Sequence, residues 1–166
     1  MKATEISATS KLEDFTWFAG YLFGQDKAVA PETGLIAKTS SSLWISYKFS
    51  DLLAVLTYDS RTSQPDNSHT HWAHSTSAAL TYDVNETHHI TARYEVLEGA
   101  NEIGYGAAVD KVQSITLADK IIISENLALY VEYRVDQADE NAFLDENNSV
   151  TKKDASLITL GALASF

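Results

Sequence analysis

A polar turn followed by a strand-like segment recurs along this chain, and that repeat limits the possible folds more than any other feature. The turns lie at residues 13, 50, 85 and 124, so successive copies are 37, 35 and 39 residues apart. In each copy the residues after the turn alternate between apolar and polar, which is the period of a β-strand. An internal repeat at such a spacing reflects one structural unit used several times. The sequence therefore predicts a string of antiparallel hairpins.

The fourth copy shows the alternation over the longest stretch. Its turn is formed by residues 124–126, and the segment after it has one apolar face and one charged face. The apolar face carries Leu127, Leu129, Val131, Tyr133 and Val135. The opposite face carries Tyr130, Glu132, Arg134 and Asp136. A strand with two such faces separates an apolar environment from a polar one.

Aromatic residues form two rows on the apolar face. In every copy a tyrosine follows the second turn residue by seven or eight positions, and a second row, which includes Phe49, lies close to the turns. Seven or eight strand residues rise roughly 23 to 27 Å, which a tilt of about 40° reduces to roughly 18 to 20 Å along a barrel axis. Two rows at that separation predict the aromatic girdles of a membrane-spanning β-barrel. The predicted girdle residues are Phe15, Trp17, Tyr21, Tyr47, Tyr58, Tyr94, Tyr133 and Phe166.

Nine strands are predicted, separated alternately by short turns and long loops. They cover approximately residues 3–12, 15–25, 39–49, 52–61, 71–83, 88–97, 111–123, 127–137 and 156–166. The long loops are predicted at residues 26–38 and 62–70, around the glycines of 99–106, and in an acidic segment within 137–153. Because turns and loops alternate strictly, all the short turns lie at one end. Bacterial outer-membrane barrels have this asymmetry, with short periplasmic turns and long extracellular loops.

The predicted fold is therefore all-β, an antiparallel up-and-down transmembrane β-barrel of about eight to ten strands. It forms a single domain over residues 1–166, either complete or part of a longer barrel. Single-chain bacterial barrels have even strand numbers, and about eight strands leave room for side chains only, whereas about 16 to 18 enclose a channel. A count of nine leaves three alternatives open. The chain is the C-terminal part of a larger barrel, a shortened barrel, or a barrel with another strand near its N-terminus.

Composition excludes several classes of function. The net charge of −11 argues against nucleic acid as a partner, and the absence of cysteine excludes disulfides and thiolate chemistry. No apolar run is long enough for a transmembrane helix. The residues after Met1 lack the apolar core of a signal peptide, so an exported protein is expected to have had its leader replaced, or the chain to be a piece of a longer one. No nucleophile elbow, phosphate loop or zinc helix motif is present, so neither an enzyme nor a cofactor is predicted.

The chain from about residue 40 onward resembles a known family, most strongly after residue 80. Residues 157–166 form an alternating strand that closes on Phe166, which resembles the assembly signal of Gram-negative outer-membrane barrels. The runs at residues 89–95, 112–117 and 132–136 are similar to OmpL-like β-barrel porins. The resemblance implies a bacterial outer-membrane channel for passive diffusion of small polar solutes, without catalytic residues or cofactor. It also implies partners: outer-membrane lipid, lipopolysaccharide and the barrel-assembly machinery, which would engage the strand ending in Phe166.

Eight charged residues of both signs are predicted on the polar face, and two interpretations of them remain open. They are Lys48, Asp59, Arg61, Arg93, Glu95, Glu132, Arg134 and Asp136. In an open barrel they would line a water-filled pore and select solutes by charge. In a small closed barrel they would form a salt-bridged plug, and the protein would act as an anchor or adhesin through its loops. A soluble ligand-carrying barrel is disfavoured because it would place its apolar face inside.

Five histidines are the remaining candidates for chemistry. They occur at His69, His71 and His74, and as the pair His88-His89. Imidazole is a common metal ligand, and His69 and His71 share one face of a predicted strand. No carboxylate motif accompanies them, and the two clusters fall near opposite ends of their strands. No metal site is therefore predicted.

Overall fold

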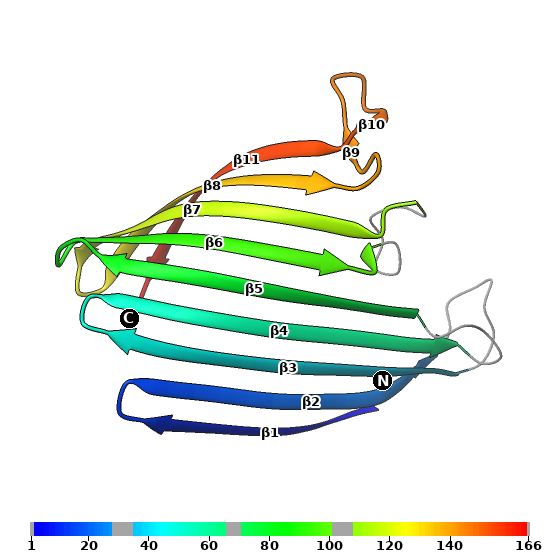
Figure 1. Ribbon diagram of the computed structural model, residues 1–166, viewed down its shortest axis with the longest axis horizontal. Helices are drawn as coiled ribbons and strands as arrows, with labels where there is room; N and C mark the ends of the chain where they lie inside the picture. The colour runs from blue at the N-terminus through cyan, green and yellow to red at the C-terminus, as the bar shows by residue number, and fades with distance from the viewer. Residues whose placement is uncertain (1, 28–34, 66–70, 101–107, 166) are drawn as a thin grey trace.

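The computed structural model describes residues 2–27, 35–65, 71–100 and 108–165, and within them the chain forms one antiparallel sheet of nine strands. The strands lie across the sheet in the order of the sequence, as Figure 1 shows, so the predicted up-and-down arrangement is confirmed. The strands are β1 (Lys2–Leu12), β2 (Phe15–Lys27), β3 (Leu35–Phe49), β4 (Leu52–Pro65), β5 (His71–Asp83), β6 (His88–Glu98), β7 (Lys111–Ser124), β8 (Leu127–Ala138) and β11 (Asp154–Ala164).

Two elements outside the large sheet form a small hairpin of their own. Strands β9 (Phe143–Leu144) and β10 (Val150–Lys152) pair with each other at the loop end of the molecule. The acidic loop predicted within 137–153 therefore contains a short hairpin that was not predicted. The loops predicted at 26–38 and 62–70 were too long, because β2 continues to Lys27, β3 begins at Leu35 and β4 runs to Pro65. Pairing between β3 and β4 extends both strands into the segments that were predicted as loops.

The short turns lie at one end of the sheet and the long connections at the other, as predicted (Figure 1). Glu13 and Ser50 adopt a positive φ of 52°, which lets a two-residue turn join β1 to β2 and β3 to β4. Between β5 and β6 the side-chain Oδ1 of Asn85 accepts hydrogen bonds from the backbone N–H groups of Thr87 and His88, at 2.8 Å each. Asparagine stabilises turns in this way.

The sheet is curved, and its two faces are opposite in character to those of a soluble protein. Along β7 the apolar Ile115 is 64% exposed, whereas the neighbouring Ser114 and Thr116 are each 4% exposed. The same alternation runs through β8, where the apolar residues from Leu127 to Val135 are exposed and the polar ones between them are half-buried. Side chains crowd on the concave side of a curved sheet. The polar face is therefore the concave one, and the convex face carries exposed apolar side chains.

Close apolar packing occurs at the loop end. Ala100, Val109, Val112 and Ala138 are buried together, and Phe143 of β9 packs against them. Gly99 begins the connection after β6 with a φ of +74°, and a Cβ atom there would lie 2.1 Å from the carbonyl oxygen of Trp72. Glycine is required at this position. No helix in the described part of the chain is both long and apolar enough to cross a membrane.

Candidate functional site

All eight charged residues predicted on the polar face lie on that face. The register places Arg93 of β6 opposite Thr116 of β7, and Thr116 opposite Arg134 of β8. In the same way Glu95 lies opposite Ser114, which lies opposite Asp136. Lys48, Asp59, Arg61 and Glu132 follow the same alternation on β3, β4 and β8. The strands thus gather the predicted charges from three regions of the sequence on one concave surface.

Two of these charges are neutralised by each other. Nε of Arg134 donates to Oδ1 of Asp136 at 2.7 Å, and its Nη2 donates to the hydroxyl of Ser114 at 2.9 Å. The Ser114 hydroxyl in turn donates to Asp136 at 2.5 Å. Each group in this triad is hydrogen bonded to the other two. The triad therefore links β7 to β8 on the concave face.

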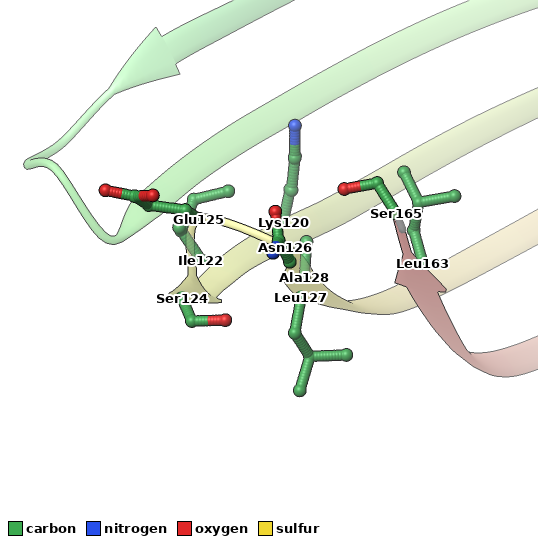
Figure 2. A pocket seen from close by; sticks show the side chains of 9 residues that line it. All are labelled: Lys120, Ile122, Ser124, Glu125, Asn126, Leu127, Ala128, Leu163 and Ser165. Carbon is green, nitrogen blue, oxygen red and sulfur yellow. The ribbon is translucent and has the colours of Figure 1, made fainter.

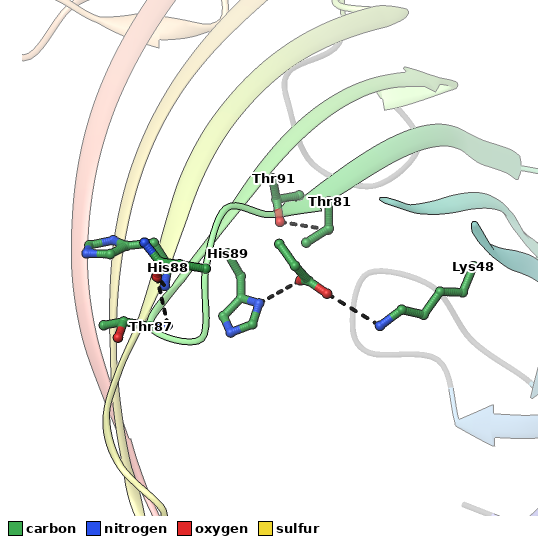
Figure 3. A network of polar contacts seen from close by, with 8 residues as sticks. Lys48, Thr81, Thr87, His88, His89 and Thr91 are labelled. Atoms are coloured by element: carbon green, nitrogen blue, oxygen red, sulfur yellow. Dashed lines mark hydrogen bonds and ion pairs between the residues drawn. The ribbon is translucent and has the colours of Figure 1, made fainter. Parts of the chain in front are cut away.

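A second network lies nearer to the turns (Figure 3). Asp83, the last residue of β5, accepts a hydrogen bond from Nζ of Lys48 at 3.4 Å and lies 2.6 Å from Nδ1 of His89. Beside it the hydroxyls of Thr81 and Thr91 are 2.8 Å apart. The network connects β3, β5 and β6, although β3 is not adjacent to β5 in the sheet. Asp83 and His89 were not among the predicted pore-lining residues.

The other five predicted charges form no ion pair within the described residues. They are Asp59, Arg61, Arg93, Glu95 and Glu132. A plug of paired charges would neutralise them, because an unpaired charge buried away from water is costly. Charges without ion pairs on a concave surface are typical of a wall in contact with water.

Several hollows lie on this surface. One, of about 330 Å³, is formed by β5 to β8 and includes Arg93, Thr116 and Lys120 in its lining. Another, of about 320 Å³, is lined by residues that include Asp59 and Arg61. A smaller one, of about 170 Å³, lies at the turn between β7 and β8 (Figure 2). Lys120 lines the first and the last of these, and Figure 2 shows its amine directed away from the turn that carries Glu125 and Asn126.

The four repeat tyrosines lie on the convex face, and the register shows how they are placed. Tyr21, Tyr58, Tyr94 and Tyr133 are 42–50% exposed. Tyr21 lies opposite Ser41, and Ser41 lies opposite Ser60. Ser60 is two residues after Tyr58, so the two tyrosines are offset by two residues along the strands. The same offset of two residues separates Tyr58 from Tyr94 and Tyr94 from Tyr133. Because barrel strands are tilted and staggered, a constant offset is what keeps a row at one height.

The second aromatic row also lies on the convex face. The register places Phe15 opposite Tyr47 and Trp17 opposite Ile45, and Tyr47 and Phe49 are exposed. Phe166, the last predicted girdle residue, lies outside the described residues.

Further aromatic residues on the convex face were not predicted. Tyr82, at the turn end of β5, is exposed and faces Leu52 and Ile90. Near the loop end, His74 stacks on Trp72 with ring centroids 5.2 Å apart and packs against Tyr58 at 5.9 Å. Beyond Tyr58 the convex face becomes polar, since Ser60 and Thr62 hydrogen bond to Ser41 and Thr39. The aromatic residues thus mark the end of the apolar band.

The histidines do not gather into a metal site in the part of the chain that the structure describes. No group of three histidine or acidic side chains there could hold a metal ion. His71 follows the polar-face alternation, whereas His74 lies on the convex face, and His69 is outside the described residues. His88 also lies on the convex face, with Nδ1 2.8 Å from Oδ2 of Asp119. The sequence indicated this polar contact in an otherwise apolar band only through a break in the alternation of polar and apolar residues.

An up-and-down sheet with a convex apolar face and a charged concave face defines an outer-membrane β-barrel protein. Residues 3–166 match the beta-barrel porin-2, OmpL-like family, and the chain belongs to that family. This membership and the outer-membrane porins described next locate the chain in the bacterial outer membrane.

Several solved outer-membrane proteins have a similar fold. The anion-selective porin from Comamonas acidovorans matches with a TM-score of 0.77 and 14% identity, over 96% of this chain and 48% of the porin. OmpT, an outer membrane protein of Vibrio cholerae, matches with a TM-score of 0.70 and 16% identity, over 98% of this chain and 55% of OmpT. The NanC porin matches with a TM-score of 0.60 and 12% identity, over 99% of this chain and 93% of NanC. No curated protein sequence matches the chain.

The solved structures confirm the predicted fold, and the family match confirms the predicted family. The chain spans about half the length of the first two structures, at 48% and 55%. The family is one of porins, which indicates a channel rather than an enzyme.

Proposed function

We propose that this chain forms the wall of an outer-membrane porin through which small polar solutes diffuse passively. The observation that carries the proposal is the set of five charged residues without ion pairs on the concave face, opposite a convex face of exposed apolar side chains. Charged groups of both signs around an aqueous path create a field that acts on solutes by their charge. Such a path needs neither a cofactor nor a catalytic residue.

Liposome swelling tests the proposal directly. The refolded chain is inserted into vesicles that contain an impermeant polymer, and the vesicles are diluted into isotonic solutions of sugars of increasing size. An open pore predicts swelling whose rate falls as the sugar becomes larger, while vesicles without protein stay unchanged. Protein that is folded and inserted but causes no swelling would instead support a closed barrel that acts as an anchor or adhesin.

The aromatic residues of the convex face support a proposal about the membrane partner. The tyrosine row and the row near the turns would lie at the two interfaces of the outer membrane, in contact with lipid and lipopolysaccharide. Tyrosine and tryptophan favour that position because their rings are apolar and their polar atoms reach water. A spin label or fluorescent quencher attached to lipid at known depth would report where Tyr58 and Tyr133 lie.

We also propose that the barrel-assembly machinery recognises the strand at the C-terminal edge of the sheet. Strand β11 pairs with β8 on one side, and its convex residues Ile158 and Leu160 are exposed. Within the described residues, the other edge of β11 does not pair with β1. An exposed strand edge is a template for strand addition. Replacing Phe166 or Ile158 by Asp should slow assembly in cells more than refolding in detergent.

A further inference from the structure

An unpaired arginine and a buried hydroxyl face each other on the concave surface. Arg93 of β6 and Thr116 of β7 are directly opposite in the register. Thr116 is 4% exposed, yet its Oγ1 has no hydrogen-bond partner among the described residues. The Arg93 guanidinium forms no ion pair in the same part of the chain. Buried hydroxyls are almost always satisfied, so this arrangement points to a ligand that bonds to both groups.

Both residues line the hollow of about 330 Å³, which is of the size that holds a small organic molecule. The hollow exists because the small side chains of Thr91 and Ala118 lie between Arg93 on one side and Lys120 on the other. Lys120 lies at the other end of the hollow. It is four residues after Thr116 in β7, so the backbones of the two residues are about 14 Å apart along the strand. Its amine lies over the ring of Tyr130, 6.0 Å from the centroid.

The charges of the lining indicate an anion. Arg93 and Lys120 are cationic and Glu132 is the only carboxylate in the lining, while the nearby His89 contacts Asp83. A guanidinium binds a carboxylate through two parallel hydrogen bonds, and a hydroxyl beside it adds a third donor. A cation would be repelled at both ends of the hollow. A neutral solute would leave the guanidinium without a charged partner.

We propose that this hollow is a binding site for small organic carboxylates on their way along the concave wall. The carboxylate lies between Arg93 and the hydroxyl of Thr116, and the rest of the molecule extends over Ala118 toward Lys120. The inference rests on the proposed function in one respect, because it takes the concave face to be accessible to aqueous solutes. It adds the class of solute and the residues that recognise it.

Calorimetric titration of the chain refolded in detergent micelles tests the site without requiring conduction. The probes are succinate and its neutral analogue succinamide, which has a similar size and shape. Succinate is expected to bind and succinamide is not. Arg93→Gln is expected to weaken succinate binding by about tenfold or more, because a hydrogen bond to a charged group is lost together with its charge.

Two further variants separate recognition from folding. Thr116→Val keeps the side-chain shape and removes a hydroxyl that has no protein partner, so folding should be unaffected and succinate binding weakened about fivefold. Arg61→Gln removes the same charge from the same face but lies outside the hollow, and should leave binding unchanged. Equal affinity of the natural chain and Arg93→Gln, or equal binding of succinamide and succinate, would overturn the proposal.

The outcome for the site and the outcome for the channel are independent. Binding that depends on Arg93 and Thr116, in a chain that causes no vesicle swelling, would uphold the site and refute the porin. Swelling by a chain that binds no succinate would uphold the porin and refute the site.

Discussion

At the scale of single residues, the face on which a side chain lies decides what it does. Leu129 and Tyr130 are consecutive, but Leu129 lies on the exposed convex face and Tyr130 lines the hollow of the concave face. The same contrast separates Ile115 from Thr116. The same substitution therefore affects stability differently at adjacent positions. The change in the free energy of unfolding reports whether the side chain lies on the convex or the concave face.

Leu129→Arg should lower the stability of the barrel in lipid by roughly 2 to 4 kcal/mol if this face contacts the middle of the bilayer. The physical reason is the cost of moving a guanidinium from water into hydrocarbon. Glu132→Arg, on the concave face of the same strand, is the control and should cost far less. Urea unfolding in lipid vesicles, followed by tryptophan fluorescence, measures both. Equal stability of the two variants would contradict the assignment of faces.

Gly99→Ala should destabilise the loop end by about 1–3 kcal/mol. The residue has a φ of +74°, and the added Cβ would lie 2.1 Å from the carbonyl oxygen of Trp72, which is a backbone atom and cannot turn aside. Gly161→Ala is a matched control, because the nearest atom its Cβ would meet is Cβ of Tyr130 at 3.8 Å. Comparison of the urea midpoints in micelles checks the difference. A larger loss at Gly161 than at Gly99 would be incompatible with this geometry.

At the scale of elements, alternation predicted the strands but could not predict the register. The strand at 71–83 was predicted with the bounds it has, because its flanking turns are polar and its alternation is regular. The start of β3 and the end of β4 were missed, since the nearby Pro31, Gly34 and Pro65 predict loops, whereas the two strands pair with each other along these segments. The pairing of Arg93 with Thr116, and hence the hollow, depends on the register. A period of two gives the face of a residue but not its neighbour across the strands.

The hairpin of β9 and β10 should loosen as the pH falls. Asp145 accepts hydrogen bonds from the backbone N–H groups of Asn147 and Ser149, at 2.8 and 3.0 Å, and from the Thr151 hydroxyl at 2.9 Å. These bonds, led by the one from Ser149, lower the pKa of the Asp145 carboxyl. A lowered pKa means that the carboxylate stabilises the hairpin fully above the ordinary value of about 3.9, and that this contribution is lost as the pH falls through the lowered one.

Amide hydrogen exchange at Asn147 and Ser149 would follow this change. Protection corrected for intrinsic exchange should be constant from about pH 7 to 5 and decline below about pH 4. Asp145→Asn keeps the shape of the side chain and removes its titration, so protection should be weaker and independent of pH. Persistent pH dependence in that variant would assign the effect to another group.

At the scale of the whole molecule, the two edges of the sheet determine how the barrel wall is completed. Strands β1 and β11 are the two edges, and within the described residues no ladder joins them. Backbone groups cannot remain unpaired in a bilayer, so each edge requires a partner strand. With nine antiparallel strands, β1 and β11 run in the same direction and would pair in parallel if they met. Completion by additional antiparallel strands would restore the ordinary pattern and enlarge the lumen.

Single-channel recording in a planar bilayer tests the central claim most directly. The refolded chain, inserted at low density, is predicted to produce discrete and stable steps of current. The step size should change when Arg93 or Arg61 is replaced by Gln, because both charges lie on the concave wall. Verified insertion without current steps would contradict the account, because a barrel that spans the membrane without conducting has no aqueous path along its charged face.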